Sequence, residues 1–251
     1  MGNKISVWSS YRDSHKKEGM GERYDNFYAT NSWHRFLWSR EQEILSDFLD
    51  SYFQNRDIHL LDFACGTGRL TNFFENRVTT SVGVDVSESM LEKARKKLNH
   101  TELIQADLTK ENVLQGRKFN LITAFRFFLN AEPGLCRSVL AALVPLLAED
   151  GYLVFNNHRN RTSPLVWIRY VWARKIRRGT PNFMTFKDVK DMVKEARLEI
   201  VRIYPVGFLS LPKGSLPESW NHAVDKIATK FKIPPIFSES PVIVCQRRSK
   251  P

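Results

Sequence analysis

One stretch of the sequence decides the fold: LDFACGTGRL, residues 61–70. Its first residues end a short apolar run, residues 58–63, that is typical of a buried strand. Residues 69–77, which follow the glycines, can form a helix. Gly66 and Gly68 lie at the turn between them, where glycine lets the backbone approach a ligand closely and the first N–H groups of a helix are free to bind it. The stretch therefore predicts a strand, a ligand-binding loop and a helix in succession.

The same alternation continues along the chain. Further strands are predicted at residues 80–85, 102–106, 119–125, 152–156, 198–204 and 241–246, and helices at 87–97, 135–147 and 185–197, with a short helix before the last strand. Glu149, Asp150 and Gly151 are interpreted as the stop signal after the second of these helices. Alternation of this kind predicts an α/β protein with a doubly wound, mostly parallel sheet and helices on both faces.

The rest of the chain is assigned around this core. We expect residues 1–57 to form an N-terminal helical cap, with a helix at 40–53, that belongs to the same domain as residues 58–251. Residues 158–184 form an insertion after the fifth strand.

The glycine loop departs from two common phosphate-binding patterns. Thr71 stands where the dinucleotide fingerprint has its third glycine, and the lysine of a P-loop is missing. Two acids add information, because Asp62 lies four residues before Gly66 and Asp85 ends the next strand. A carboxylate at the tip of a second strand accepts hydrogen bonds from the two hydroxyls of a ribose, so the loop predicts a ribose-containing ligand.

At this point the chain resembles the class I S-adenosylmethionine-dependent methyltransferases. The matching segments occur in the order and at the spacing of that family: residues 61–68, 82–91, 105–108 and 148–154. The resemblance implies a Rossmann-like fold with a seven-stranded sheet, and S-adenosyl-L-methionine as the cofactor.

The resemblance also implies roles for individual residues. Asp62 and the loop residues hold the methionine part of the cofactor, Asp85 binds the ribose, Val86 and Met90 pack on the adenine, and Asp107 and Leu108 lie at its edge and face. The full set of expected cofactor-binding residues is Asp62, Ala64, Cys65, Gly66, Thr67, Gly68, Asp85, Val86, Met90, Asp107, Leu108 and Phe125. Ala64 replaces the usual first glycine of the family, and Asp107 as a plain turn residue and Met90 as a plain core residue stay open as alternatives.

The reaction site of such a sheet faces the carboxyl ends of strands one, four and five. Residues 125–130 and 156–159 follow strands four and five. His158 is the candidate catalytic base because an imidazole ordinarily titrates near neutral pH, although it can instead orient a loop or bind substrate. Arg126, the second candidate catalytic residue, can anchor an acidic group of the substrate or pair with a carboxylate of the protein.

Two enzyme classes are disfavoured by the residues after strand four. Residues 124–127, AFRF, lack the Asp/Asn-Pro-Pro-aromatic turn of amino-methylating DNA enzymes, and no cysteine follows this strand as cytosine-carbon methylation requires. The three cysteines (Cys65, Cys136, Cys245) are too few and too widely spaced for a disulfide framework or a zinc cluster, so we expect no metal site and a reducing, cytoplasmic setting.

The charge of the chain points to an anionic partner. Its 251 residues include 38 Lys and Arg against 27 Asp and Glu, a formal charge of +11. Residues 151–187 contain no acid and eight basic residues. Leu165, Ile168, Trp172 and Ile176 form an apolar row at helical spacing within this segment. This helix can close over or pack on the core, lie at an anionic membrane surface, or follow a nucleic-acid backbone.

The N-terminus carries few signals. It lacks the apolar run of a signal peptide, and the chain has no stretch of 18 apolar residues. Gly2 followed by Ser6 fits the pattern for N-myristoylation. Tyr11, Tyr24 and Tyr28 belong to a segment that resembles the variable cap of small-molecule methyltransferases, and they can line the site or attach the cap to the core.

These observations predict a methyltransferase that acts on an oxygen or nitrogen atom of a small or lipid-linked, anionic acceptor, with no obligate protein partner evident. We expect it in the cytoplasm, with peripheral membrane contact as an open possibility. RNA methylation is the alternative within enzymes, disfavoured because no RNA-binding module is recognisable. A cofactor-binding scaffold without catalysis is the alternative from another class.

Overall fold

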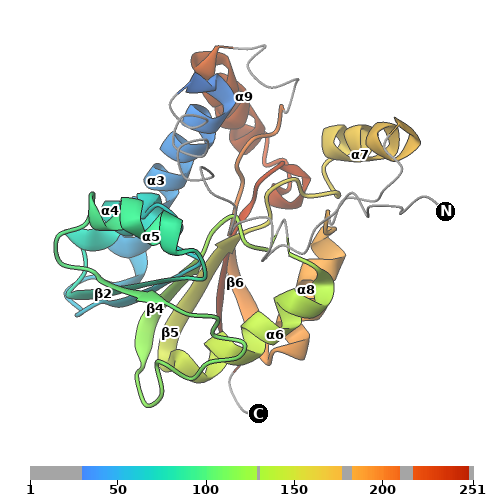
Figure 1. Ribbon diagram of the computed structural model, residues 1–251. Helices are drawn as coiled ribbons and strands as arrows, with labels where there is room; N and C mark the ends of the chain where they lie inside the picture. The colour runs from blue at the N-terminus through green and yellow to red at the C-terminus, as the bar shows by residue number, and fades with distance from the viewer. Residues whose placement is uncertain (1–29, 129–130, 177–182, 210–216, 249–251) are drawn as a thin grey trace.

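The computed structural model describes residues 30–128, 131–176, 183–209 and 217–248. The predictions that concern Gly2, Tyr11, Tyr24 and Tyr28 lie outside these ranges. Within them, helices cover both faces of a twisted sheet (Figure 1).

The sheet has seven strands in the order β3-β2-β1-β4-β5-β7-β6. The strands are β1 (His59–Phe63), β2 (Thr80–Asp85), β3 (Glu102–Gln105), β4 (Phe119–Ala124), β5 (Leu147–Asn156), β6 (Leu198–Tyr204) and β7 (Val242–Arg247). The first five are parallel, whereas β7 runs antiparallel to both β5 and β6. The predicted mostly parallel, doubly wound, seven-stranded sheet is confirmed.

Neighbouring residues of the central strands point to opposite faces of the sheet, as the twofold period of a strand requires. Leu60 and Leu121 pack in the cluster that contains α3 (Ser32–Tyr52) and α4 (Arg69–Glu75). Leu61 and Ile122 pack in the cluster that contains α6 (Pro133–Leu143) and α8 (Phe186–Glu195). The remaining helices are α5 (Glu88–Arg95), α7 (Pro164–Ile176) and α9 (Glu218–Lys230), with 3₁₀ turns at Val144–Leu146 and Pro235–Phe237.

Helix α3 begins eight residues before the predicted start at residue 40. The side chain of Asn31 caps it by accepting hydrogen bonds from the backbone N–H groups of Trp33 and His34. The added turns bury Trp33, His34, Phe36 and Leu37, so the described part of the predicted cap, residues 30–57, is mostly helical.

The predicted helix at 135–147 and its stop signal are wrong at the carboxyl end. Helix α6 ends at Leu143, and β5 already begins at Leu147, so Glu149, Asp150 and Gly151 lie within a strand. Pro145 has no N–H to continue an α-helix, and a 3₁₀ turn takes its place. A register shift between Phe119 and Leu121 of β4 accommodates the early start of β5.

Helix α7 confirms the predicted helix of the insertion but not the packing of its apolar row. Ile168 and Trp172 are 56% and 66% exposed, whereas Val166 is fully buried. These two residues of the row therefore point away from the core, which Val166 faces. No helix among the described residues combines the length and the apolar character needed to cross a membrane.

The close approach of β5 to β4 leads to the first prediction. A Cβ atom on Gly151 would lie 3.0 Å from Cα and 3.1 Å from O of Asn120, both backbone atoms that cannot give way alone. Gly151→Ala should lower the free energy of unfolding by about 1–3 kcal/mol in denaturant titrations. Gly134→Ala is the control, since nothing lies within 4 Å of its added Cβ and helix α6 should gain up to about 1 kcal/mol. Equal stability of the two variants would contradict the tight β4–β5 contact.

Candidate active site

A pocket opens at the carboxyl ends of β1 and β2 and has an empty volume of about 460 Å³. Of the predicted cofactor residues, the structure gathers five in its wall: Ala64, Asp85, Val86, Asp107 and Leu108. Six further residues complete the wall: Phe63, Val84, Ala106, Phe127, Leu135 and Val139. Apolar walls with a carboxylate among them fit a flat base joined to a ribose.

Sequence reasoning missed those six residues as part of the site. Leu135 and Val139 lie four residues apart on α6, so both face the pocket from one side of the helix. Phe127 was expected on the acceptor side, and its ring instead packs edge-on to Phe63 with centroids 5.1 Å apart. The spacing of Leu135 and Val139 could have indicated that both face the same site. The sequence did not indicate that Phe127 packs against Phe63 at the end of β1.

The glycine loop has the backbone geometry that its residues suggest. Ala64, Gly66 and Gly68 have φ angles of 55°, 57° and 74°, in the left-handed region that favours glycine. A Cβ atom on Gly68 would lie 3.0 Å from Cδ1 of Leu98 and 3.1 Å from Cβ of Ala94. Gly68 thus lets the start of α4 pack against α5, and Ala64 adopts the conformation for which the family ordinarily uses glycine.

Asp85 is fixed at the mouth of the loop. Its two carboxylate oxygens accept hydrogen bonds from the backbone N–H groups of Gly66 and Ser87, both at 2.9 Å. A carboxylate oxygen has more than one lone pair, so each can still accept a hydroxyl group of a ligand. The loop and the tip of β2 therefore hold each other in place, with the carboxylate in the pocket wall.

Asp62 lies deeper and is buried. Its oxygens accept hydrogen bonds from the hydroxyls of Thr71, at 2.6 Å, and Thr123, at 2.7 Å. Burial raises the pKa of Asp62 to about 6, against the lowering effect of the two hydroxyls. Thr71, which replaces the third glycine of the dinucleotide pattern, therefore serves to satisfy this carboxylate.

The remaining predicted loop and adenine residues lie in the interior. Met90 and Phe125 are buried core residues, which for Met90 is the alternative left open above. The thiol of Cys65 faces Gly83 of β2, and burial raises its pKa. Thr67 is also buried. Asp107 lines the pocket and also accepts hydrogen bonds from Thr109, so it stabilises a turn and belongs to the pocket wall at the same time.

The acceptor side contains a buried ionic cluster. Arg126 follows β4 with a φ of 62°, and its Nη2 donates to Oε1 of Glu41 at 2.8 Å. Asn156 at the end of β5 donates to the same oxygen at 3.0 Å, and Nη1 of Arg69 lies 3.6 Å from the other oxygen of Glu41. Of the two alternatives for Arg126, the structure shows pairing with a protein carboxylate. Glu41 itself was not singled out from the sequence.

His158 follows β5 and is buried, with its ring centroid 6.3 Å from that of His34 on α3. Its loop is tied to the segment before β7, because Asn157 N–H donates to Pro241 O and the Asn160 amide donates to Ser238 O, each at 3.0 Å. The two candidate catalytic residues therefore lie at the carboxyl ends of neighbouring strands, beneath α3.

The raised pKa of Asp62 predicts a pH dependence of stability. Between its ordinary value of 3.8 and about 6, the folded protein holds a proton that the unfolded chain has released, so stability falls as the pH rises through this window. Asp62→Asn should remove this loss, about 3 kcal/mol in all, when urea unfolding is compared at the two ends of the window. Asp50→Asn, at an exposed site, should keep the wild-type profile. Parallel profiles of wild type and Asp62→Asn would contradict the buried, proton-binding carboxylate.

A third prediction concerns Asp85. Asp85→Ala should weaken S-adenosylhomocysteine binding at least about tenfold in calorimetry, because hydrogen bonds to a charged group contribute about 1.5–3 kcal/mol each. Asp150→Ala removes an exposed carboxylate that pairs with Arg56 and should leave the affinity unchanged. Unchanged affinity of a folded Asp85→Ala variant would remove Asp85 from the cofactor site.

A parallel sheet with a glycine loop after β1 and a carboxylate at the tip of β2 defines a nucleoside-binding α/β protein. Comparison with known proteins refines this class. The model of the methyltransferase domain matches residues 37–203, about two thirds of the chain. The chain belongs to the family of S-adenosylmethionine-dependent class I methyltransferases.

Individual relatives cover less of the chain. It is 28% identical over 158 residues to the malonyl-[acyl-carrier protein] O-methyltransferase of Acetivibrio thermocellus, covering 60% of this chain and 54% of that protein. It is 38% identical over 65 residues to a dTDP-3-amino-3,4,6-trideoxy-α-D-glucopyranose N,N-dimethyltransferase of Streptomyces venezuelae, covering 26% and 27%. The chain thus spans about half or less of the length of these relatives.

Solved structures share the fold over nearly the whole chain. The magnesium protoporphyrin IX methyltransferase of Synechocystis with bound S-adenosylhomocysteine superposes with a TM-score of 0.65 at 15% identity, covering 94% of this chain and 97% of that one. An S-adenosylmethionine-dependent methyltransferase of Clostridium acetobutylicum gives a TM-score of 0.60 at 16% identity, covering 92% and 100%.

Proposed function

We propose that this protein transfers a methyl group from S-adenosylmethionine to an oxygen or nitrogen atom of a small, anionic acceptor. The observation that carries the proposal is the pocket at the carboxyl ends of β1 and β2, in which Asp85 is held by the glycine loop among apolar walls. The two relatives named for O- and N,N-dimethyl transfer support both kinds of acceptor atom.

The cofactor, when bound, supplies a sulfonium methyl group that is already activated for attack. Asp85 would hold its ribose, and Val86 and Leu108 would cover its base, so that the methyl group is aligned and screened from water. Asp62 and the remaining residues of the glycine loop would hold the methionine part of the cofactor. The hydrogen bonds of Asp85 to Gly66 and Ser87 fix the backbone of that loop.

On the acceptor side, His158 would accept the proton that an O–H or N–H acceptor loses as the methyl group arrives. Two arginines, Arg126 and Arg69, share the one carboxylate of Glu41, an excess of one positive charge within that cluster. That excess favours an anionic acceptor, whose acidic group would compete with Glu41 for Arg126.

A lipid-linked acceptor is the second candidate, favoured by one observation. Trp167 and Trp172 of α7 are 56% and 66% exposed on a helix that follows β5 and its reaction-site loop. An acceptor carried on a lipid would bring its reactive group to the site while its chain stays in a membrane next to α7.

The function is tested by incubating the protein with labelled S-adenosylmethionine and with metabolite, lipid and RNA extracts. We expect label in acidic metabolites or in lipids. Label in RNA would favour the RNA methyltransferase alternative, and label in none of the extracts would favour the non-catalytic scaffold.

Once an acceptor is found, His158→Gln should lower kcat by about a hundredfold or more while S-adenosylhomocysteine still binds, as expected on loss of a general base. His100→Gln, at an exposed position before β3, is the matched control and should keep wild-type activity. Full activity of the His158→Gln variant would exclude His158 as the catalytic base and would leave it the role of orienting its loop.

A further inference from the structure

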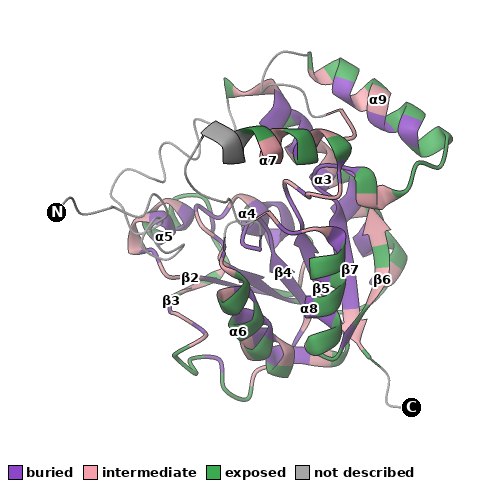
Figure 2. Ribbon diagram, turned by 90° about the vertical axis from the view of Figure 1, so that its right-hand side faces the viewer, coloured by how far each residue is buried: buried purple, intermediate pink, exposed green. Residues whose placement is uncertain are grey.

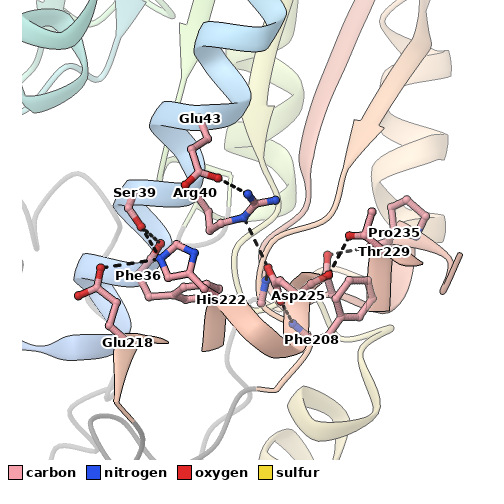
Figure 3. Close-up of polar contacts among 12 residues, drawn as sticks. Phe36, Ser39, Arg40, Glu43, Phe208, Glu218, His222, Asp225, Thr229 and Pro235 are labelled. Atoms are coloured by element: carbon pink, nitrogen blue, oxygen red, sulfur yellow. Dashed lines mark hydrogen bonds and ion pairs between the residues drawn. The ribbon is translucent and has the colours of Figure 1, made fainter. Parts of the chain in front are cut away.

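Helix α9 attaches to α3 through polar contacts, which Figure 3 shows from the side. The ring of His222 lies 3.0 Å from the hydroxyl of Ser39. Asp225 is buried, accepts a hydrogen bond from Gly207 N–H at 2.9 Å and lies 3.9 Å from Nε of Arg40. The side of α9 that faces the protein is therefore largely polar, the reverse of an ordinary surface helix, which packs its apolar side inward.

The largest apolar side chains of α9 and of Phe231, the residue that follows it, point to solvent instead. Trp220, Ile227 and Phe231 are 62%, 54% and 74% exposed, and their spacing of seven and four residues aligns them on one side of the helix. Ile233 and Phe237, in the segment that follows, are also among the exposed large apolar residues. A row of this size, exposed in the described part of the chain, indicates a surface that binds a partner.

The surroundings of this row are basic. Lys226, Lys230 and Lys232 are exposed next to it. Asp225 is the only acid between residues 219 and 238, and it is buried against α3. The surface therefore combines exposed aromatic and aliphatic side chains with uncompensated positive charge.

Helix α7 also presents exposed apolar residues at the same end of the molecule. Trp167, Ile168 and Trp172 are exposed on it, and its Arg169 pairs with Glu239. Figures 1 and 2 both show α7 and α9 beyond the carboxyl ends of the strands, the end that carries the reaction site. We call the exposed apolar residues of the two helices the docking face: Trp167, Ile168, Trp172, Trp220, Ile227 and Phe231.

We propose that the docking face binds the surface of an anionic lipid bilayer. Tryptophan and phenylalanine partition into the interfacial region of a membrane, and lysines beside them are attracted by anionic headgroups. The isoleucines decide against a nucleic acid as the occupant, because they neither bind phosphates nor stack on bases, whereas acyl chains bury them. Docking in this way turns the reaction site toward the membrane, and it does not depend on the proposed function, since binding requires neither cofactor nor acceptor.

The test is co-sedimentation of the full chain with phosphatidylcholine vesicles, with and without phosphatidylserine. Wild type should sediment with the anionic vesicles, and salt should weaken the binding. Replacing Lys226, Lys230 and Lys232 together by Gln should lower the partition coefficient about a hundredfold, since each basic residue near the surface contributes about fivefold. Replacing Trp220, Ile227 and Phe231 together by Ser should lower it at least about tenfold.

The matched control replaces Lys96, Lys97 and Lys118 by Gln. These exposed lysines precede β3 and β4, at the opposite end of the sheet, and the change in charge is the same. The control should sediment like wild type. All variants should bind S-adenosylhomocysteine as wild type does, which separates loss of docking from loss of the fold.

Three results would overturn the inference. The first is that wild type stays in the supernatant in the presence of anionic vesicles. The second is that both α9 variants sediment like wild type. The third is that wild type does not bind vesicles but forms a dimer, and that the serine variant does not dimerise. That result would assign the docking face to contact with a second copy of the chain. None of these results depends on methyl transfer, so each can be read even if no acceptor is ever found.

Discussion

The fully buried carboxylate of Glu41 connects three parts of the molecule that are distant in sequence. Arg126 after β4, Asn156 at the end of β5 and Arg69 at the start of α4 all lie against it. Losing one partner of such a buried charge typically costs about 3–5 kcal/mol, because the other partner is left without compensation. Helix α3 is therefore fastened to the carboxyl ends of β4 and β5, and α9 in turn rests on α3.

This arrangement divides the site by element. The nucleoside pocket is built from the ends of β1 and β2, the segment after β3, Phe127 and one side of α6. Asp85 fixes the glycine loop by accepting a hydrogen bond from Gly66 N–H. The proposed acceptor side is built from the segments after β4 and β5 and from α3. Glu41 joins the two parts, because it lies against Arg126 and Asn156 on that side and against Arg69, which follows the glycine loop.

The sequence predicted what depends on local patterns. The strands Thr80–Asp85 and Leu198–Tyr204 match their predicted ranges, because apolar runs bounded by turn residues are local signals. The pocket residue Asp85 followed from its place at the tip of the second strand, and Ala64 followed from the resemblance to the methyltransferase family. The early start of β5 was missed because it depends on the register with β4.

Contacts between distant parts of the chain were not predictable in the same way. Arg126 and Glu41 are 85 residues apart, and no pattern in a single sequence indicates which carboxylate an arginine meets. The same applies to α9, whose spacing shows an apolar row but not which side packs on α3. An inward apolar side was the ordinary expectation, and the polar contacts of His222 and Asp225 reverse it.

The antiparallel direction of β7 has a consequence for how the family can diversify. Because β7 begins where β5 ends, the chain between α9 and β7 returns to the reaction edge, where Asn160 holds it through Ser238. Insertions or substitutions in that return segment would reshape the proposed acceptor side, while β1 and β2, whose ends carry the nucleoside pocket, lie three and four positions from β7 in the sheet order. A change of substrate can thus evolve in the segment before β7 without disturbing cofactor recognition, because the residues of the nucleoside pocket lie between Phe63 and Val139.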